Sequence, residues 1–141
     1  MNRKGFTLIE LLAIIVVIGI VAVLVAPSII KSFNTSKEKA YNLLINNIRT
    51  AGENYYLECE NGNLKSINSK YCNQNDSKIT VTLNELVELG ILKASDNNNS
   101  IKNPQNDKDI GNCSITIEKE IGDYSKTTFD ITIPEDTCFT D

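Results

Sequence analysis

The sequence predicts an α+β fold, in which one long N-terminal helix packs against a small head with an antiparallel β-sheet. Three observations carry this prediction: an apolar N-terminal stretch, an amphipathic continuation with helical spacing, and two alternating segments near the C-terminus. Helix first and strands afterwards favours α+β over a parallel α/β arrangement. The expected divisions are a leader, a membrane-spanning helix, its amphipathic half and the head: residues 1–5, 6–30, 31–57 and 58–141.

The apolar stretch over residues 6–30 is long enough to cross the roughly 30 Å hydrocarbon core of a membrane. Arg3 and Lys4 precede it and favour a cytoplasmic N-terminus, although Lys31 and later lysines weaken that bias. An ordinary secretory signal peptide fits poorly, because the apolar run is long and no small-x-small cleavage site follows it. We therefore expect a single-pass membrane protein whose head lies outside the cytoplasm.

Glu10 interrupts this apolar stretch near its start. A carboxylate costs about 2.5–3.5 kcal/mol at the middle of a membrane and less near its edge, so it needs a partner or a function. No cation follows three or four residues later in the sequence. A simple membrane anchor leaves Glu10 unexplained, and the partner must come from elsewhere.

The segment Gly5-Phe6-Thr7-Leu8-Ile9-Glu10-Leu11-Leu12 resembles the class III signal of type IV pilins and pseudopilins, and the resemblance covers residues 3–30. It implies that a membrane prepilin peptidase cuts between Gly5 and Phe6 and then N-methylates Phe6. It also implies that the subunit joins other pilin subunits at an inner-membrane assembly platform. The chemistry agrees, because cleavage turns the Phe6 amide into an ammonium that can pair with Glu10 of a neighbour. Gly5 tolerates the unusual backbone geometry of a protease cleft.

Gly19 and Pro27 lie inside the apolar stretch. Both weaken a helix, although membrane helices commonly contain such residues. The resemblance implies that this segment bends or unwinds when the helix packs in a filament.

Beyond Lys31 the chain becomes amphipathic, with one apolar face that predicts a single helix over residues 6–57. The members of this face are Ala40, Leu44, Ile48, Ala51 and Tyr55.

The head shows clear local signals. Thr82 and Glu85 fit a capping box that starts a short helix, and Gly90 suits its end. The segments 114–118 and 127–133 alternate between apolar and polar residues and predict an antiparallel hairpin. Two polar stretches, residues 58–78 and 93–112, are expected to be irregular.

Four cysteines lie in the head, which favours disulfides because small exported domains bury little apolar surface. Three pairings are possible, and we favour Cys59–Cys72 and Cys113–Cys138. A zinc site is the rival hypothesis, but the sequence contains no C-x-x-C pair. Free thiols remain an alternative for an organism that lives without oxygen.

The loop from Asp96 to Asp109 could hold calcium, as the heads of some secretion pseudopilins do. Asp96, Asp107 and Asp109 supply hard oxygen ligands, but their spacing is not that of an EF-hand. A solvated loop is the favoured interpretation, and no metal or cofactor is expected.

The composition excludes several functions. The chain has no His, which removes the usual general base, and it has no Gly-rich phosphate loop, so an enzyme is not expected. Its formal net charge of −4 disfavours nucleic-acid binding. We expect a structural subunit of a type IV pilus or a similar filament, first in the cytoplasmic membrane and then on the cell surface. The alternatives are a pseudopilin of a type II secretion or competence (DNA uptake) machine, and a membrane-anchored binding module that does not polymerise.

Overall fold

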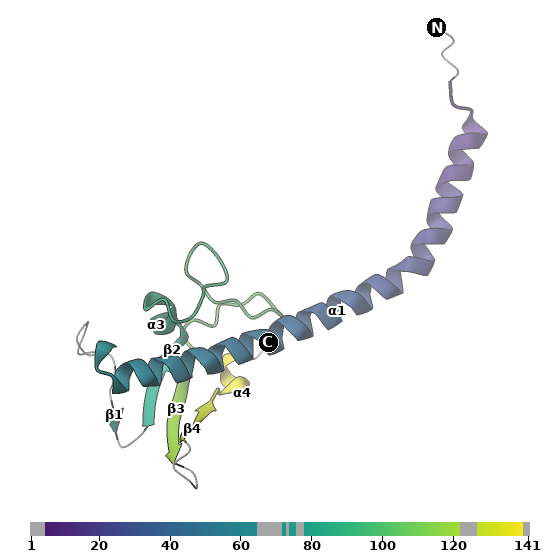
Figure 1. Cartoon of the computed structure of the whole chain (residues 1–141). Coiled ribbons are helices and arrows are strands. Elements are labelled where there is room, and N and C mark those ends of the chain that lie inside the picture. Colours follow the sequence, from purple (N-terminus) through teal and green to yellow (C-terminus); the bar gives the residue numbers. More distant parts are fainter. Residues whose placement is uncertain (1–4, 65–71, 73, 76–77, 122–126, 140–141) are drawn as a thin grey trace. The chain divides into compact units, whose positions relative to one another are not determined.

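The computed structural model describes residues 5–64, 72, 74–75, 78–121 and 127–139, so most of the expected leader lies outside the described residues. The chain forms two compact units, Met1–Lys39 and Ala40–Asp141. Figure 1 shows the order of the elements along the chain. These elements are α1 (Leu8–Glu60), β1 (Gln74–Asn75), β2 (Lys78–Thr82), α3 (Leu83–Glu88), β3 (Ser114–Ile121), β4 (Thr127–Thr132) and α4 (Glu135–Cys138).

Helix α1 confirms the predicted long helix, with bounds that differ by a few residues from the expected 6–57. Every described residue of the first unit is exposed to solvent in the isolated chain. The N-terminal part of α1 is long and apolar enough to cross a membrane. Pro27 lies within the helix.

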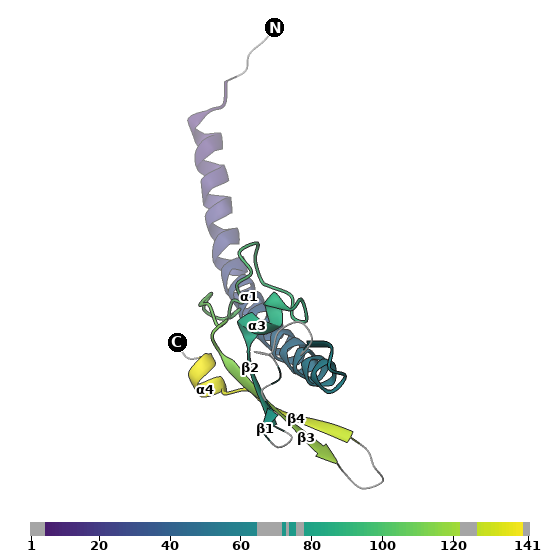
Figure 2. The same ribbon diagram turned by 90° about the vertical axis from the view of Figure 1, so that its left-hand side faces the viewer.

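The four strands of the described sheet are all antiparallel and follow the order β1-β2-β3-β4. The predicted hairpin is present, and Figure 2 shows its strands β3 and β4 side by side. Ile117 of β3 lies opposite Ile131 of β4. Strands β1 and β2 were not predicted, and β1 lies in a stretch that we expected to be irregular. β2 buries Ile79 and Val81 on one face, so a short alternating pattern was overlooked.

One face of the sheet packs against the second half of α1. The hydrophobic core joins Ile48 and Tyr55 of the helix to Ile79, Ile115 and Ile131 of the strands. The predicted face of α1 was only partly right, because Ala40 is exposed and Leu44 is half-buried. Burial begins at Ile45 and includes neighbouring positions that a narrow stripe omits, because a sheet covers a wider sector of a helix than one row of side chains. The buried residues of α1 are Ile45, Ile48, Ala51, Gly52, Tyr55, Tyr56 and Cys59.

Helix α3 starts and ends as predicted. The Glu85 amide donates to Thr82 Oγ1 at 3.3 Å, and the Thr82 amide donates to a Glu85 carboxylate oxygen at 3.0 Å. These reciprocal bonds form the capping box. Gly90 has a φ of +70°, the left-handed conformation that glycine adopts readily after a helix.

The loop after α3 is less solvated than its composition suggests. The loop contains an isolated antiparallel β-bridge between Lys102 and Asp109. Ile101, Asn103 and Ile110 are nevertheless buried, so this polar stretch closes part of the core.

Two disulfides join the pairs that we favoured from the sequence, Cys59–Cys72 and Cys113–Cys138. The second bond attaches the short helix α4, which was not predicted, to the start of β3. Aromatic packing also holds this segment, because the rings of Tyr41 and Phe139 meet edge to face with centroids 5.2 Å apart.

Candidate processing and assembly site

The residues just before α1 have no regular secondary structure. Gly5, Phe6 and Thr7 precede the helix, and the side chain of Phe6 is 80% exposed. A Cβ added to Gly5 would meet no atom within 4 Å. The described structure therefore gives no internal reason for glycine at position 5, which is consistent with a requirement set by a protein that binds this segment.

Thr7 and Glu10 form a capping box at the start of α1. The Thr7 amide and the Thr7 hydroxyl both donate to Glu10 Oε2, each at 3.0 Å. In return, the Glu10 amide donates to Thr7 Oγ1 at 3.3 Å. The carbonyl of Thr7 accepts the first helical hydrogen bond, from the Leu11 amide at 3.2 Å, as an N-cap residue does.

The role of Glu10 in this capping box was not predicted from the sequence. We expected a cation from another subunit to pair with the carboxylate, which stays a prediction, and the described structure adds local hydrogen-bond donors. A signal for them was present, because Thr7-x-x-Glu10 has the same spacing as the capping box that was recognised at Thr82 and Glu85.

The capping box uses only one carboxylate oxygen of Glu10. Within the described residues, both side-chain hydrogen bonds to Glu10 end on Oε2 and none ends on Oε1. A carboxylate has room for about four hydrogen bonds. The arrangement therefore holds one oxygen at the start of the helix and leaves the other able to accept a cation from another molecule.

The helix surface around Glu10 is apolar. Leu8, Ile9 and Leu11 are 84%, 74% and 60% exposed, and the exposed apolar surface continues to Ile30. A helix that is apolar on all sides requires lipid or other helices around it. Gly19 lies in this part of α1, and a Cβ there would meet nothing within 4 Å. The proposed flexibility at Gly19 and Pro27 stays a prediction.

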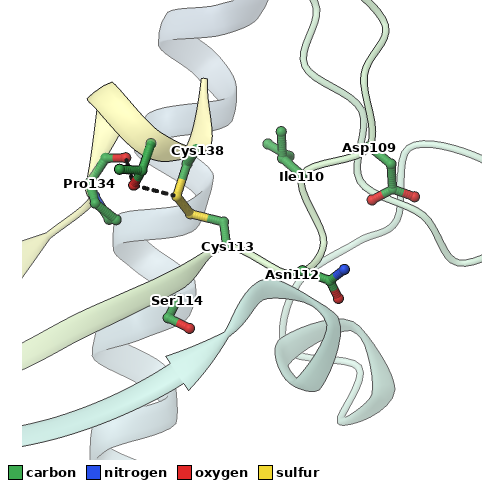
Figure 3. Close-up of a pocket in the computed structure, with 8 residues that line it drawn as sticks. Asp109, Ile110, Asn112, Cys113, Ser114, Pro134 and Cys138 are labelled. Carbon is green, nitrogen blue, oxygen red and sulfur yellow. Dashed lines mark hydrogen bonds between the residues drawn. A yellow bond between two sulfur atoms is a disulfide. The ribbon is translucent and has the colours of Figure 1, made fainter. Parts of the chain in front are cut away.

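The head contains an open pocket of about 430 Å³ beside the Cys113–Cys138 disulfide (Figure 3). Several of its polar groups are already engaged: Asp109 Oδ1 accepts from the Gly111 amide, and Thr137 Oγ1 donates to the Pro134 carbonyl. Both cysteines are bonded to each other, so neither thiol can act as a nucleophile or metal ligand. The pocket is lined by Asp109, Ile110, Asn112, Cys113, Ser114, Pro134, Thr137 and Cys138.

The Asp96 carboxylate of the acidic loop is engaged within the loop itself. Asp96 closes its own turn, because its carboxylate accepts from the Ser100 hydroxyl and from the amides of Ser100 and Asn98. The Ser100 hydroxyl, followed by the Ser100 amide, holds the pKa of Asp96 below its ordinary value. No group of three or more acidic, His or Cys side chains in the described parts of the chain could hold a metal ion.

The N-terminal segment combines an exposed, non-helical stretch with an apolar helix that is long enough to cross a membrane. Residues 1–26 match the family model of the prokaryotic N-terminal methylation motif, which is the class III prepilin signal of type IV pilins and pseudopilins. The matched range contains Gly5, Phe6, Thr7 and Glu10. No significant match was found among curated proteins or solved structures. The motif indicates a structural subunit that is a substrate of prepilin peptidase and assembles with other pilin subunits.

Proposed function

We propose that this chain is a structural subunit of a type IV pilus or a pilus-like filament on the cell surface. The observation that carries the proposal is the methylation motif over residues 1–26, which includes the start of α1, a helix whose apolar side chains are exposed as far as Ile30. The subunit waits in the cytoplasmic membrane with its head outside, and an inner-membrane assembly platform transfers it to the filament.

Processing begins with hydrolysis of the peptide bond between Gly5 and Phe6. Water adds to the carbonyl carbon of Gly5, which becomes a carboxylate, and the Phe6 nitrogen leaves as an amine that is protonated at neutral pH. Methylation of this amine replaces one hydrogen and preserves the positive charge. The exposed, non-helical backbone at Gly5 and Phe6 supports this step, because a protease binds its substrate in an extended conformation.

Assembly depends on the new ammonium and on Glu10. Among apolar helices, an ammonium and a carboxylate attract each other far more strongly than they do in water. Removal of one partner from a buried pair typically costs about 3–5 kcal/mol, because the other charge is left without compensation. We therefore assign the pairing to the Phe6 nitrogen of an incoming subunit and Glu10 of a subunit already in the filament.

The first experiment measures the N-terminus of the purified protein by mass spectrometry. The wild-type chain is expected to begin at methylated Phe6, and Gly5→Glu is expected to retain Met1. Gly19→Ala is the matched control, because it also replaces a glycine without neighbours but lies away from the cut. A wild-type chain that still begins at Met1 would refute the proposed processing.

The second experiment tests assembly with Glu10→Val, which removes the carboxylate and makes membrane insertion easier. The variant is expected to be cleaved and inserted, yet to be depleted from filaments sheared off the cells. Wild-type amounts of Glu10→Val in the sheared fraction would disprove the charge-pair account. Wild-type subunits that are processed but remain in short, cell-bound fibres would favour a secretion or DNA-uptake pseudopilin.

A further inference from the structure

We propose that Thr7 is a positioning residue for assembly: it fixes the Glu10 carboxylate so that Oε1 faces the Phe6 ammonium of a second copy of this chain. The inference rests on the proposed function and adds a residue to it. Thr7 itself does not touch the incoming amine. It acts through Glu10.

The geometry supports a positioning role. Among the described residues, the hydrogen bonds to the Glu10 carboxylate come from Thr7. Two donors from Thr7 converge on Oε2 at 3.0 Å each. Glu10 is exposed, and its sequence neighbours Ile9 and Leu11 carry only apolar side chains. A glutamate side chain has three rotatable bonds and loses up to roughly 2 kcal/mol of entropy when it is fixed. Because the capping box already orders the Glu10 side chain in the single subunit, this entropy is not lost again when the subunits associate.

The same contacts give the two carboxylate oxygens of Glu10 different roles. Oε2 satisfies donors at the helix N-terminus, where negative charge is also favoured by the helix dipole. Oε1 has no hydrogen bond among the described residues and remains able to accept the ammonium. The carboxylate is thus partly compensated in the single subunit and fully compensated only after a second copy binds.

The existence of the cation is supported independently of this geometry. The methylation motif over residues 1–26 concerns a new N-terminal amine, and that amine belongs to Phe6 in this sequence. Each copy therefore supplies one ammonium and one half-occupied carboxylate, which are complementary groups in neighbouring copies.

The test compares two substitutions of Thr7 in the full-length protein expressed in its own cells. Thr7→Val keeps the shape of the side chain and the amide that donates to Glu10 Oε2, but it loses both hydrogen bonds of the hydroxyl, whereas Thr7→Ser keeps the hydroxyl. Thr35→Val is the matched control, since the Thr35 hydroxyl bonds to the Lys31 carbonyl in the same helix but far from Glu10 in sequence. Mass spectrometry first measures processing, and the sheared-filament fraction is then expressed per processed subunit.

We expect Thr7→Val to lower the filament fraction roughly twofold to thirtyfold, the range that the loss of an N-cap hydroxyl produces. Thr7→Ser and Thr35→Val should assemble like the wild type. Wild-type assembly of Thr7→Val, or an equal loss in Thr7→Ser, would overturn the proposal.

A double-mutant cycle separates positioning from simple helix stabilisation. Glu10→Gln retains an oxygen that Thr7 can hold but has no charge. If Thr7 acts through the charge of Glu10, Thr7→Val should cause no additional loss in the Glu10→Gln background. The same fold-loss in both backgrounds would contradict the inference while leaving the proposed function intact. A wild-type chain that is not cleaved at Gly5–Phe6 would instead overturn the proposed function.

Discussion

Gly52 is the position where a small change should disturb the packing of α1 on the sheet. It lies on the buried face of the helix. A Cβ at this position would lie 3.2 Å from Cδ1 of Ile131, 3.3 Å from Cδ1 of Ile115 and 3.4 Å from Cγ1 of Ile117. The side chains of Ile131 and Ile115 would therefore have to shift by a few tenths of an ångström to admit one methyl group, with Ile117 already in contact.

Two opposing effects set the magnitude. Alanine stabilises a helix by about 0.5–1 kcal/mol relative to glycine. Overpacking of a core costs about 1–3 kcal/mol. Gly52→Ala should therefore lower the free energy of unfolding by about 0–2.5 kcal/mol. Gly52→Val adds two further methyl groups and gains less helix propensity, so its loss should be about 2–3 kcal/mol.

Urea unfolding of the full-length protein in detergent measures these changes. Tyrosine fluorescence reports on the core, because the chain has no Trp and Tyr55 and Tyr56 are 2% and 3% exposed. Thr50→Val is the control, since it places the same side chain on an exposed position of α1 and should change stability by about 0.5 kcal/mol or less. Ile131→Val removes the nearest methyl group and should reduce the penalty of Gly52→Ala. Wild-type stability of Gly52→Val would refute the close packing of helix and sheet.

Three other predictions concern the head. Replacing Cys113 and Cys138 by serine should lower the free energy of unfolding by about 2–4 kcal/mol. This difference between the variant and the wild type should disappear when both proteins are measured under reducing conditions. Burial, together with the hydrogen bond to Glu135, raises the pKa of Tyr41 to about 12 from its ordinary value of 10.0. The stability contributed by the protonated tyrosine should therefore be complete below pH 10 and lost as the pH rises to about 12, and Tyr41→Phe should not show this alkaline loss. Thr82→Ala should cost about 0.5–2 kcal/mol in thermal unfolding, and Thr82→Ser much less.

The elements that the sequence predicted have strong local signals. The hairpin β3–β4 alternates over several residues, and α3 has both a capping box and a terminal glycine. β1 has no such signal, because Gln74 and Asn75 become a strand only by pairing with Ile79 and Lys78. Tertiary contacts also bury Ile101 inside a polar loop, where no periodicity marks it.

The candidate site divides in the same way. Gly5, Phe6 and Glu10 were predicted because their order resembles a known signal, whereas the position of the Glu10 side chain required the structure. From the sequence, Glu10 is a charge among apolar residues. Its second property, a pair of acceptor oxygens at the start of a helix, becomes visible only when the Thr7 hydrogen bonds are known.

The apolar surface of α1 cannot by itself specify how subunits align. In a membrane its side chains already contact hydrocarbon, so transfer to a helix bundle removes little apolar surface from water. Helix packing then depends on close contact, which Leu, Ile and Val side chains permit in many axial positions. A charge pair behaves differently, because an unpaired ammonium or carboxylate is expensive in this environment and only one axial position satisfies both. In the filament that we propose, register selection would therefore depend on Glu10, and its precision would depend on the Thr7 contacts that hold one carboxylate oxygen and leave the other for the neighbour.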